Sequence, residues 1–257
     1  MRTSAPNFRP GWATYLSHFT HYPVIIGLDM ELAAVAPIAG YDQYLTVTIP
    51  LKDPLPNGFP KEEELSLFWK IERDIVKQLE KGLNAIYAGR TTTQGRKHLI
   101  FFLYDVGQST EIIELVQQDY PAYAIESRLE PDPEWDIYFD LLFPNLEETN
   151  SLLNQRTVNR LMRQGDDLTQ PRRVDHWIYF KTLEGRAAFS QIAQSNGFET
   201  ILVAARPDDH HYPYLVRTRK EHLVDLKNIN AITTELRSWA RLYGGDYDGW
   251  ETVITPT

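Results

Sequence analysis

The order of apolar runs in residues 174–254 is the feature that most constrains the fold of this chain. Runs rich in β-branched and aromatic residues alternate there with two segments of helical periodicity. In order, the segments are strand 174–180, helix 183–195, strands 198–205 and 212–219, helix 225–243 and strand 247–254. This βαββαβ order is the split arrangement of a ferredoxin-like sandwich, in which two helices cover one face of an antiparallel sheet.

Residues 1–148 mix helix and strand patterns without regular β-α-β alternation. A buried stripe predicts a helix over residues 61–82, and its members are Phe68, Ile71, Ile75 and Leu79. The other expected elements are a helix at 109–118 and strands at 24–35, 41–51, 84–88, 98–105, 122–129 and 135–143. We expect the first two strands to pair as a hairpin around a turn at 37–40. The pattern predicts an α+β domain, an antiparallel sheet with helices.

A length of 257 residues favours two domains. We place them at residues 1–148 and 149–257, the second including a connector helix that starts after Asn145 and a joint at 165–171. The first carries 12 basic against 22 acidic residues, and the second 14 against 13. The acidic domain suits a basic protein surface. Neither domain has the basic stripe of a nucleic-acid binder, so we expect no direct nucleic-acid contact.

The absence of cysteine excludes disulfides, thiol catalysis and cysteine zinc sites, and it favours a reducing compartment. The first twenty residues lack the apolar core of a signal peptide. Runs such as 24–28 and 99–104 are far shorter than the roughly 18 apolar residues that span a bilayer. These observations predict a cytoplasmic protein without a membrane segment.

Four consecutive polar residues are the best candidates for a metal site: Asp208, Asp209, His210 and His211. Carboxylates and imidazoles are common metal ligands, but four consecutive side chains cannot all point at one ion. The segment is equally typical of a solvated turn. It is the basis of the alternative that stays open, a small-molecule or metal-dependent enzyme.

Two further patterns have ordinary structural explanations. Residues 89–97 differ from a phosphate loop in glycine spacing, and the flanking strand patterns indicate a hairpin tip. His176 follows Asp175, but adjacent strand residues face opposite ways, so the carboxylate is not expected to orient the imidazole. The chain contains none of the familiar catalytic motifs that we sought. We therefore predict a non-enzymatic protein without a cofactor.

One segment near the end of the chain combines aromatic rings and acids around an Asp-Gly step: Tyr247, Asp248, Gly249, Trp250 and Glu251. Exposed aromatics beside acids are typical of a protein interface, so these five residues are the candidate partner-binding site. The alternative is a strand bulge with Trp250 in the core.

The same segment carries a family resemblance. Residues 175–180, 184–186, 212–214 and 246–252, the last with its Tyr-Asp-Gly-Trp core, resemble the RraB family of regulators of ribonuclease E. The resemblance covers residues 174–254. It implies a ferredoxin-like fold and a non-enzymatic role in which the protein binds the endoribonuclease, lowers its activity and does not touch RNA.

The first half is similar to a bacterial module, domain of unknown function 695, that is often fused ahead of RraB-like domains. The likeness rests on the acidic helix start at 62–64 and on Tyr104 and Asp105 at a strand end. It implies no activity. RraB proteins are strongly acidic, whereas the acidity of this chain lies in residues 1–148. We expect a protein partner, with ribonuclease E the first candidate.

Overall fold

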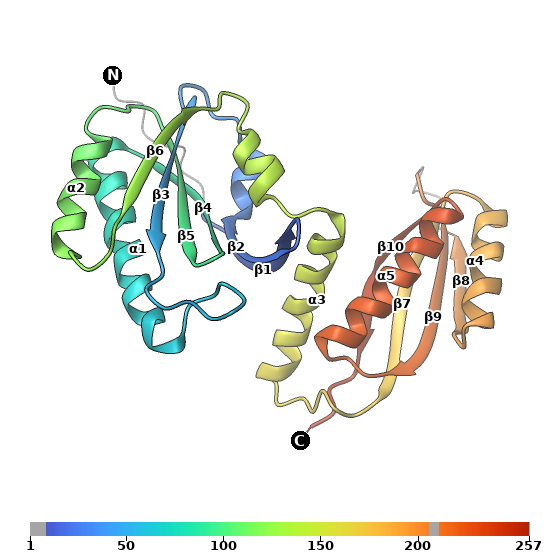
Figure 1. Cartoon of the computed structure of the whole chain (residues 1–257). Helices are drawn as coiled ribbons and strands as arrows, with labels where there is room; N and C mark the ends of the chain where they lie inside the picture. The colour runs from blue at the N-terminus through green and yellow to red at the C-terminus, as the bar shows by residue number, and fades with distance from the viewer. Residues whose placement is uncertain (1–8, 206–210, 257) are drawn as a thin grey trace. The chain divides into compact units, whose positions relative to one another are not determined.

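The computed structural model describes residues 9–205 and 211–256 and divides the chain into two compact units, Met1–Pro144 and Asn145–Thr257 (Figure 1). Each mixes helices with one antiparallel sheet, as the sequence predicts. The described helices include none that is long and apolar enough to cross a bilayer.

The first unit is built on a six-stranded antiparallel sheet in the order β1-β2-β4-β5-β3-β6. Its elements are β1 (Trp12–Phe19), β2 (Tyr22–Asp29), the 3-10 helix η1 (Met30–Ala34), β3 (Gln43–Pro50), α1 (Glu62–Leu83), β4 (Ile86–Thr93), β5 (Arg96–Leu103), α2 (Ser109–Asp119), β6 (Glu126–Pro131) and the π-helical turn η2 (Ile137–Leu142).

Helices α1 and α2 lie together on one side of this sheet (Figure 1). The predicted stripe of α1 is fully buried there against alternate residues of β3 and β5, such as Val47 and Leu99. On the opposite face the indole of Trp135 stacks on Phe102, with ring centroids 3.7 Å apart. The sheet is therefore buried on both faces over its central strands.

The predicted hairpin of residues 24–35 and 41–51 is wrong. β2 pairs with β1 and β4, whereas β3 pairs with β5 and β6. The alternation at Trp12–Phe19 supplies the true hairpin partner of β2, and this strand was missed. The expected hairpin tip at 89–97 is confirmed, since β4 and β5 pair around Gln94 and Gly95, both at positive φ.

The expected strand at 135–143 is instead the turn η2. Its cause lies just upstream, where the carboxylate of Asp132 accepts hydrogen bonds from the backbone N–H groups of Asp136 and Ile137 at 2.8 and 3.0 Å. These bonds satisfy N–H groups at the start of the turn. Trp135 and Tyr138, three residues apart, are then both fully buried.

The second unit has the predicted βαββαβ order and the sheet order β10-β7-β9-β8, with every neighbouring pair antiparallel. Its elements are α3 (Leu146–Arg163), β7 (Arg172–Phe180), α4 (Leu183–Ser195), β8 (Glu199–Ala205), β9 (Tyr214–His222), α5 (Leu226–Leu242) and β10 (Gly245–Thr252). This confirms the ferredoxin-like sandwich.

The segment 165–171, predicted as an interdomain joint, lies inside the second unit. Asp166 is buried there and accepts a 2.5 Å hydrogen bond from the guanidinium of Arg172. Polar composition suggested a solvated linker, but a buried ion pair anchors this loop. Asn145 caps α3 through a reciprocal capping box with Glu148.

Candidate functional site

The Tyr-Asp-Gly-Trp segment forms a β-bulge in strand β10, where the pairing register with β7 shifts between Tyr247 and Gly249. The bulge leaves Asp248 without an opposite residue, and its side chain is exposed. Glu251 is also exposed, whereas Tyr247 is buried and Trp250 is half-buried. The backbone of the segment is therefore a strand bulge, one of the two alternatives that the sequence left open. The side chains of Asp248 and Glu251 are exposed and accessible to a partner.

Tyr247 belongs to a buried polar chain. Its hydroxyl lies 2.8 Å from Nδ1 of His176, whose Nε2 lies 3.2 Å from Nε2 of His222. Nδ1 of His222 lies 2.7 Å from the backbone carbonyl of Leu223. A carbonyl can only accept, so His222 donates from Nδ1 and accepts at Nε2. His176 then donates from Nε2, and Tyr247 donates to Nδ1 of His176.

Burial and the neighbouring His222 lower the pKa of His176 to about 3, and burial lowers the pKa of His222 as well. Both imidazoles are therefore neutral near pH 7. This hydrogen-bond network of Tyr247, His176 and His222 has a structural role in the core, because each of its polar side-chain atoms has a hydrogen-bond partner and His176 is fully buried.

Trp250 is held by the connector helix. Its indole N–H donates to Oδ1 of Asn154 on α3 at 2.8 Å. The amide nitrogen of Asn154 reaches Asn230 and Thr233 on α5, each at 2.8 Å. One buried asparagine thus joins α3, α5 and β10.

The helices of the second unit pack on one face of its sheet, the face of Ile178 and Val216. Asp175 and Trp177 alternate with these residues and point to the opposite face. Asp175 accepts hydrogen bonds from Arg219 at 2.5 and 2.9 Å, so it does not orient His176, as expected.

On this opposite face two rows of residues run across the strands. Glu251 lies opposite Asp175, which lies opposite Arg219. Gly249 lies opposite Trp177, whose ring centroid is 5.0 Å from the guanidinium carbon of Arg217. Gly249 has no side chain, so the residue directly opposite Trp177 on β10 does not cover the indole. The candidate segment thus borders a surface with an exposed acid, a half-buried tryptophan and arginines.

Three of the four metal-ligand candidates, Asp208, Asp209 and His210, lie outside the described residues. His211 is described and is exposed. Among residues 9–205 and 211–256, no group of three or more metal-ligating side chains is arranged to hold an ion.

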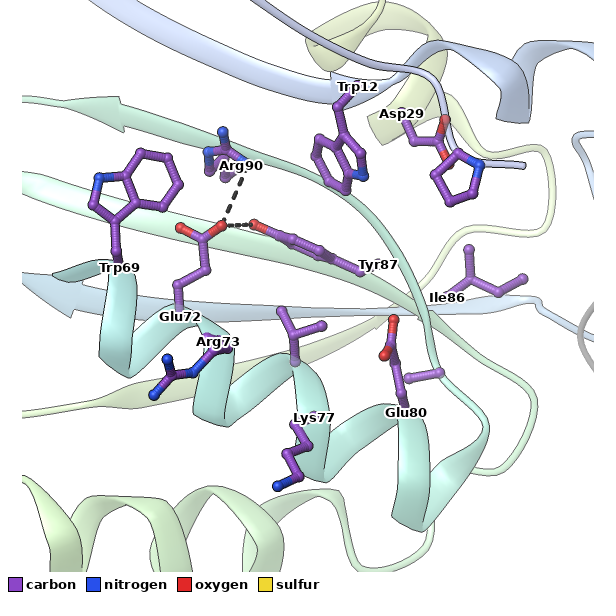
Figure 2. A pocket seen from close by; sticks show the side chains of 13 residues that line it. Trp12, Asp29, Trp69, Glu72, Arg73, Lys77, Glu80, Ile86, Tyr87 and Arg90 are labelled. Atoms are coloured by element: carbon purple, nitrogen blue, oxygen red, sulfur yellow. Dashed lines mark hydrogen bonds and ion pairs between the residues drawn. The ribbon is translucent and has the colours of Figure 1, made fainter. Parts of the chain in front are cut away.

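The first unit carries a groove of about 590 Å³ that the sequence analysis missed. One wall is helix α1, with Trp69, Glu72 and Glu80, and the other is formed by β4 and the start of β1, with Arg90 and Trp12 (Figure 2). Both tryptophans are exposed, 41% for Trp12 and 51% for Trp69.

Arg90 lies between the two indoles, with its guanidinium carbon 5.3 Å from the centroid of Trp12 and 4.9 Å from that of Trp69 (Figure 2). Its NH1 lies 3.3 Å from Oε1 of Glu72, which also accepts the hydroxyl of Tyr87 at 3.0 Å. Lys97 forms an ion pair with the other carboxylate oxygen. Burial raises the pKa of Tyr87 and lowers that of Lys97.

Of the three residues that form the groove's cation–aromatic cluster, the sequence could have indicated Trp69 alone. Trp69 lies one position after the buried Phe68 and therefore outside the apolar stripe of α1, where its indole is exposed. Trp12 and Arg90 come from segments whose pairing was mispredicted or unassigned. Only the sheet register brings the three together.

Family comparisons divide the chain as the structure does. Residues 10–143 match the model of a family of unknown function, DUF695, and residues 153–252 match that of RraB, regulator of ribonuclease activity B. No curated protein matches the chain.

Two solved structures show low similarity. An unknown protein from Galdieria sulphuraria has 10% identity and a TM-score of 0.23, covering 83% of this chain and 99% of its own. A putative glycine cleavage system transcriptional repressor has 10% identity and a TM-score of 0.25, covering 83% and 98%. At these TM-scores neither likeness supports an inference.

Proposed function

Because the chain belongs to the DUF695 family through residues 10–143 and carries an RraB domain at residues 153–252, we propose that it is a non-enzymatic regulator that binds a protein. Its target is an endoribonuclease of the ribonuclease E type, and it acts in the cytoplasm. The observation that carries this proposal is the RraB match on a domain with the ferredoxin-like order.

The docking surface is the helix-free face of the second unit along strand β10, which we call the β10 face. We define it by Trp177, Arg217 and Glu251, together with Asp248 at the bulge on the edge strand. Tryptophan and arginine are the residue types that most often dominate binding energy at protein interfaces. Tyr247 and Trp250 support this surface from the buried side, through His176 and Asn154.

The two acids give the β10 face its preference for a basic partner. Asp248 projects from the bulge and Glu251 extends the charged row of Asp175 and Arg219. Exposed charges at the rim of an interface act mainly on association rate and specificity, and salt screens them. Binding is therefore expected to weaken as ionic strength rises.

The test is a binding measurement with purified ribonuclease E from the host. We expect the double variant Asp248→Lys with Glu251→Lys to bind at least tenfold more weakly at moderate salt. The matched control is Glu184→Lys, an exposed acid at the start of α4, which should bind as the parent does. Equal affinity of both variants would reject the β10 face, and no binding by the parent chain would reject the partner.

A further inference from the structure

The groove between α1 and the β4–β1 side of the first unit takes no part in the function proposed above. It lies in the other compact unit and is built from different residues. Its volume is within the roughly 300–1,000 Å³ range of small-molecule sites, and it combines apolar walls with a few charged groups, as such sites do.

One end of the groove is suited to an anion. Two cations, Arg90 and Lys97, flank the single carboxylate of Glu72, which leaves an excess positive charge. Arginine has five N–H donors in a planar fork, and Glu72 engages one side of that fork in the described contacts. The indoles of Trp12 and Trp69 flank the guanidinium, which lies against Gly27 of β2, and the N–H groups that do not contact Glu72 can donate to an anion in the groove.

The middle of the groove is apolar. Tyr87 lies below Trp12, with ring centroids 5.0 Å apart, and Val76, Ala85 and Ile86 continue the lining (Figure 2). The hydroxyl of Tyr87 is directed to Glu72, so the ring presents carbon to the groove. A flat or branched hydrocarbon body would bury its surface here.

The other end carries Glu80, whose carboxyl group stands in the groove (Figure 2). Glu80 is exposed, and the partial burial of its carboxyl group raises the pKa of that group. The carboxylate oxygens can accept a hydrogen bond from a donor on a ligand. The groove thus offers a site for an anion at Arg90 on β4 and a site for a hydrogen-bond donor at Glu80 on α1.

We propose that this groove binds a small organic acid with an aromatic or branched aliphatic body. The carboxylate accepts from N–H groups of Arg90 that do not contact Glu72, and the body lies against the apolar lining of Val76, Ala85 and Ile86. This assigns a ligand site to the DUF695 domain. It stands independently of the β10 face.

The probes are three carboxylates, phenylacetate, indole-3-acetate and 4-methylpentanoate, each beside its neutral amide. Binding to the full chain is measured by ligand-observed NMR titration. We expect at least one carboxylate to bind with a dissociation constant on the order of 1 mM, as ligands of this size do. Its amide should bind at least tenfold more weakly, because the charge on the anion is lost.

Substitutions distinguish ligand binding in the groove from non-specific binding elsewhere on the protein. Arg90→Gln should weaken binding at least tenfold, whereas Arg128→Gln, at an exposed arginine on β6 whose ion pair is with Glu130, should not change it. Trp69→Ala should weaken binding several-fold, and because Trp69 is half exposed, the fold is retained. The matched control is Leu115→Ala, an exposed apolar residue on α2.

Three results would overturn the proposal. They are no binding of any carboxylate at 10-fold above the expected dissociation constant (~10 mM), equal binding of acid and amide, and unchanged binding in both folded variants, Arg90→Gln and Trp69→Ala.

Discussion

His176 shows how one buried residue can fix a network. It is fully buried, yet both ring nitrogens are engaged, by Tyr247 and by His222. The carbonyl of Leu223 sets the direction of every hydrogen bond in that chain. Protonation of either imidazole would turn an acceptor nitrogen into a donor and so disrupt the hydrogen bonds of this network. The network therefore requires both histidines to be neutral.

This requirement predicts a pH dependence of stability. The pKa of His176 is about 3 in the folded state and near 6.5 when the chain is unfolded, so below pH 6.5 the unfolded state binds more protons. Stability is full above pH 6.5. It should fall by about 1.4 kcal/mol per pH unit below that, or about 2 kcal/mol by pH 5.

The measurement is denaturant unfolding at pH 7.5 and pH 5, with the β7 and β9 amides followed by NMR. His176→Gln should remove most of the pH-dependent loss. A parent protein whose second unit keeps the same unfolding free energy at both pH values would contradict the neutral network.

Gly185 lies at a close contact between helix α4 and the end of helix α5. A Cβ placed there would lie 2.2 Å from the backbone carbonyl oxygen of Tyr243. Helix α4 can therefore approach the end of α5 only with glycine at this position. We expect Gly185→Ala to destabilise the second unit by about 1–3 kcal/mol, the usual cost of overpacking. Unchanged denaturant midpoints would contradict this packing.

At the scale of elements, α3 is fastened to its unit by polar as well as apolar contacts. Asn154 is buried and uses its amide for α5 and its carbonyl oxygen for the indole of Trp250 on β10. Leu161 adds an apolar contact with Val174 and Val224. The connector helix is thus an integral part of the second unit.

Trp250→Phe tests this fastening, because it keeps an aromatic ring and removes the N–H donor. The carbonyl oxygen of Asn154 would be left buried without that donor, which costs about 1–2 kcal/mol. We expect a lower denaturant midpoint and faster amide exchange in α3. Trp177→Phe, on the opposite face, should change stability less, and equal effects would argue against the role of Asn154.

The elements also show which parts of the fold the sequence predicts. Residues 174–254 were predictable because each element has its own period and turn residues, although β8 and β9 are the one pair of described strands there adjacent both in sequence and in the sheet. The first unit was harder, because β3 is inserted between β5 and β6, far from its neighbours in sequence. The turn η2 depends on the carboxylate of Asp132, which no apolar pattern reveals.

The candidate sites differ in the same way: one is contiguous in sequence, and the other is assembled from distant segments. The Tyr-Asp-Gly-Trp segment is contiguous, so the sequence indicated it, although the burial of Tyr247 required its partner His176. The groove of the first unit combines Trp12, Trp69 and Arg90 from three elements. Its assembly depends on sheet register, which composition and periodicity do not specify.

In the whole molecule we assign a different function to each of the two units. We assign the β10 face of the second unit to a protein partner, and the first unit adds the groove and most of the negative charge, with 22 acidic against 12 basic residues over 1–148. That charge would raise the association rate with a basic partner. The rate should therefore fall more steeply with salt than the two acids of the β10 face alone would explain.

The most direct measurement is cleavage of a single-stranded RNA by purified host ribonuclease E with increasing amounts of this protein. We expect saturable inhibition, without binding of the protein to the RNA alone, and at least tenfold weaker inhibition by the double variant Asp248→Lys with Glu251→Lys. Cleavage that stays unchanged at saturating protein would show that this chain does not regulate such an enzyme.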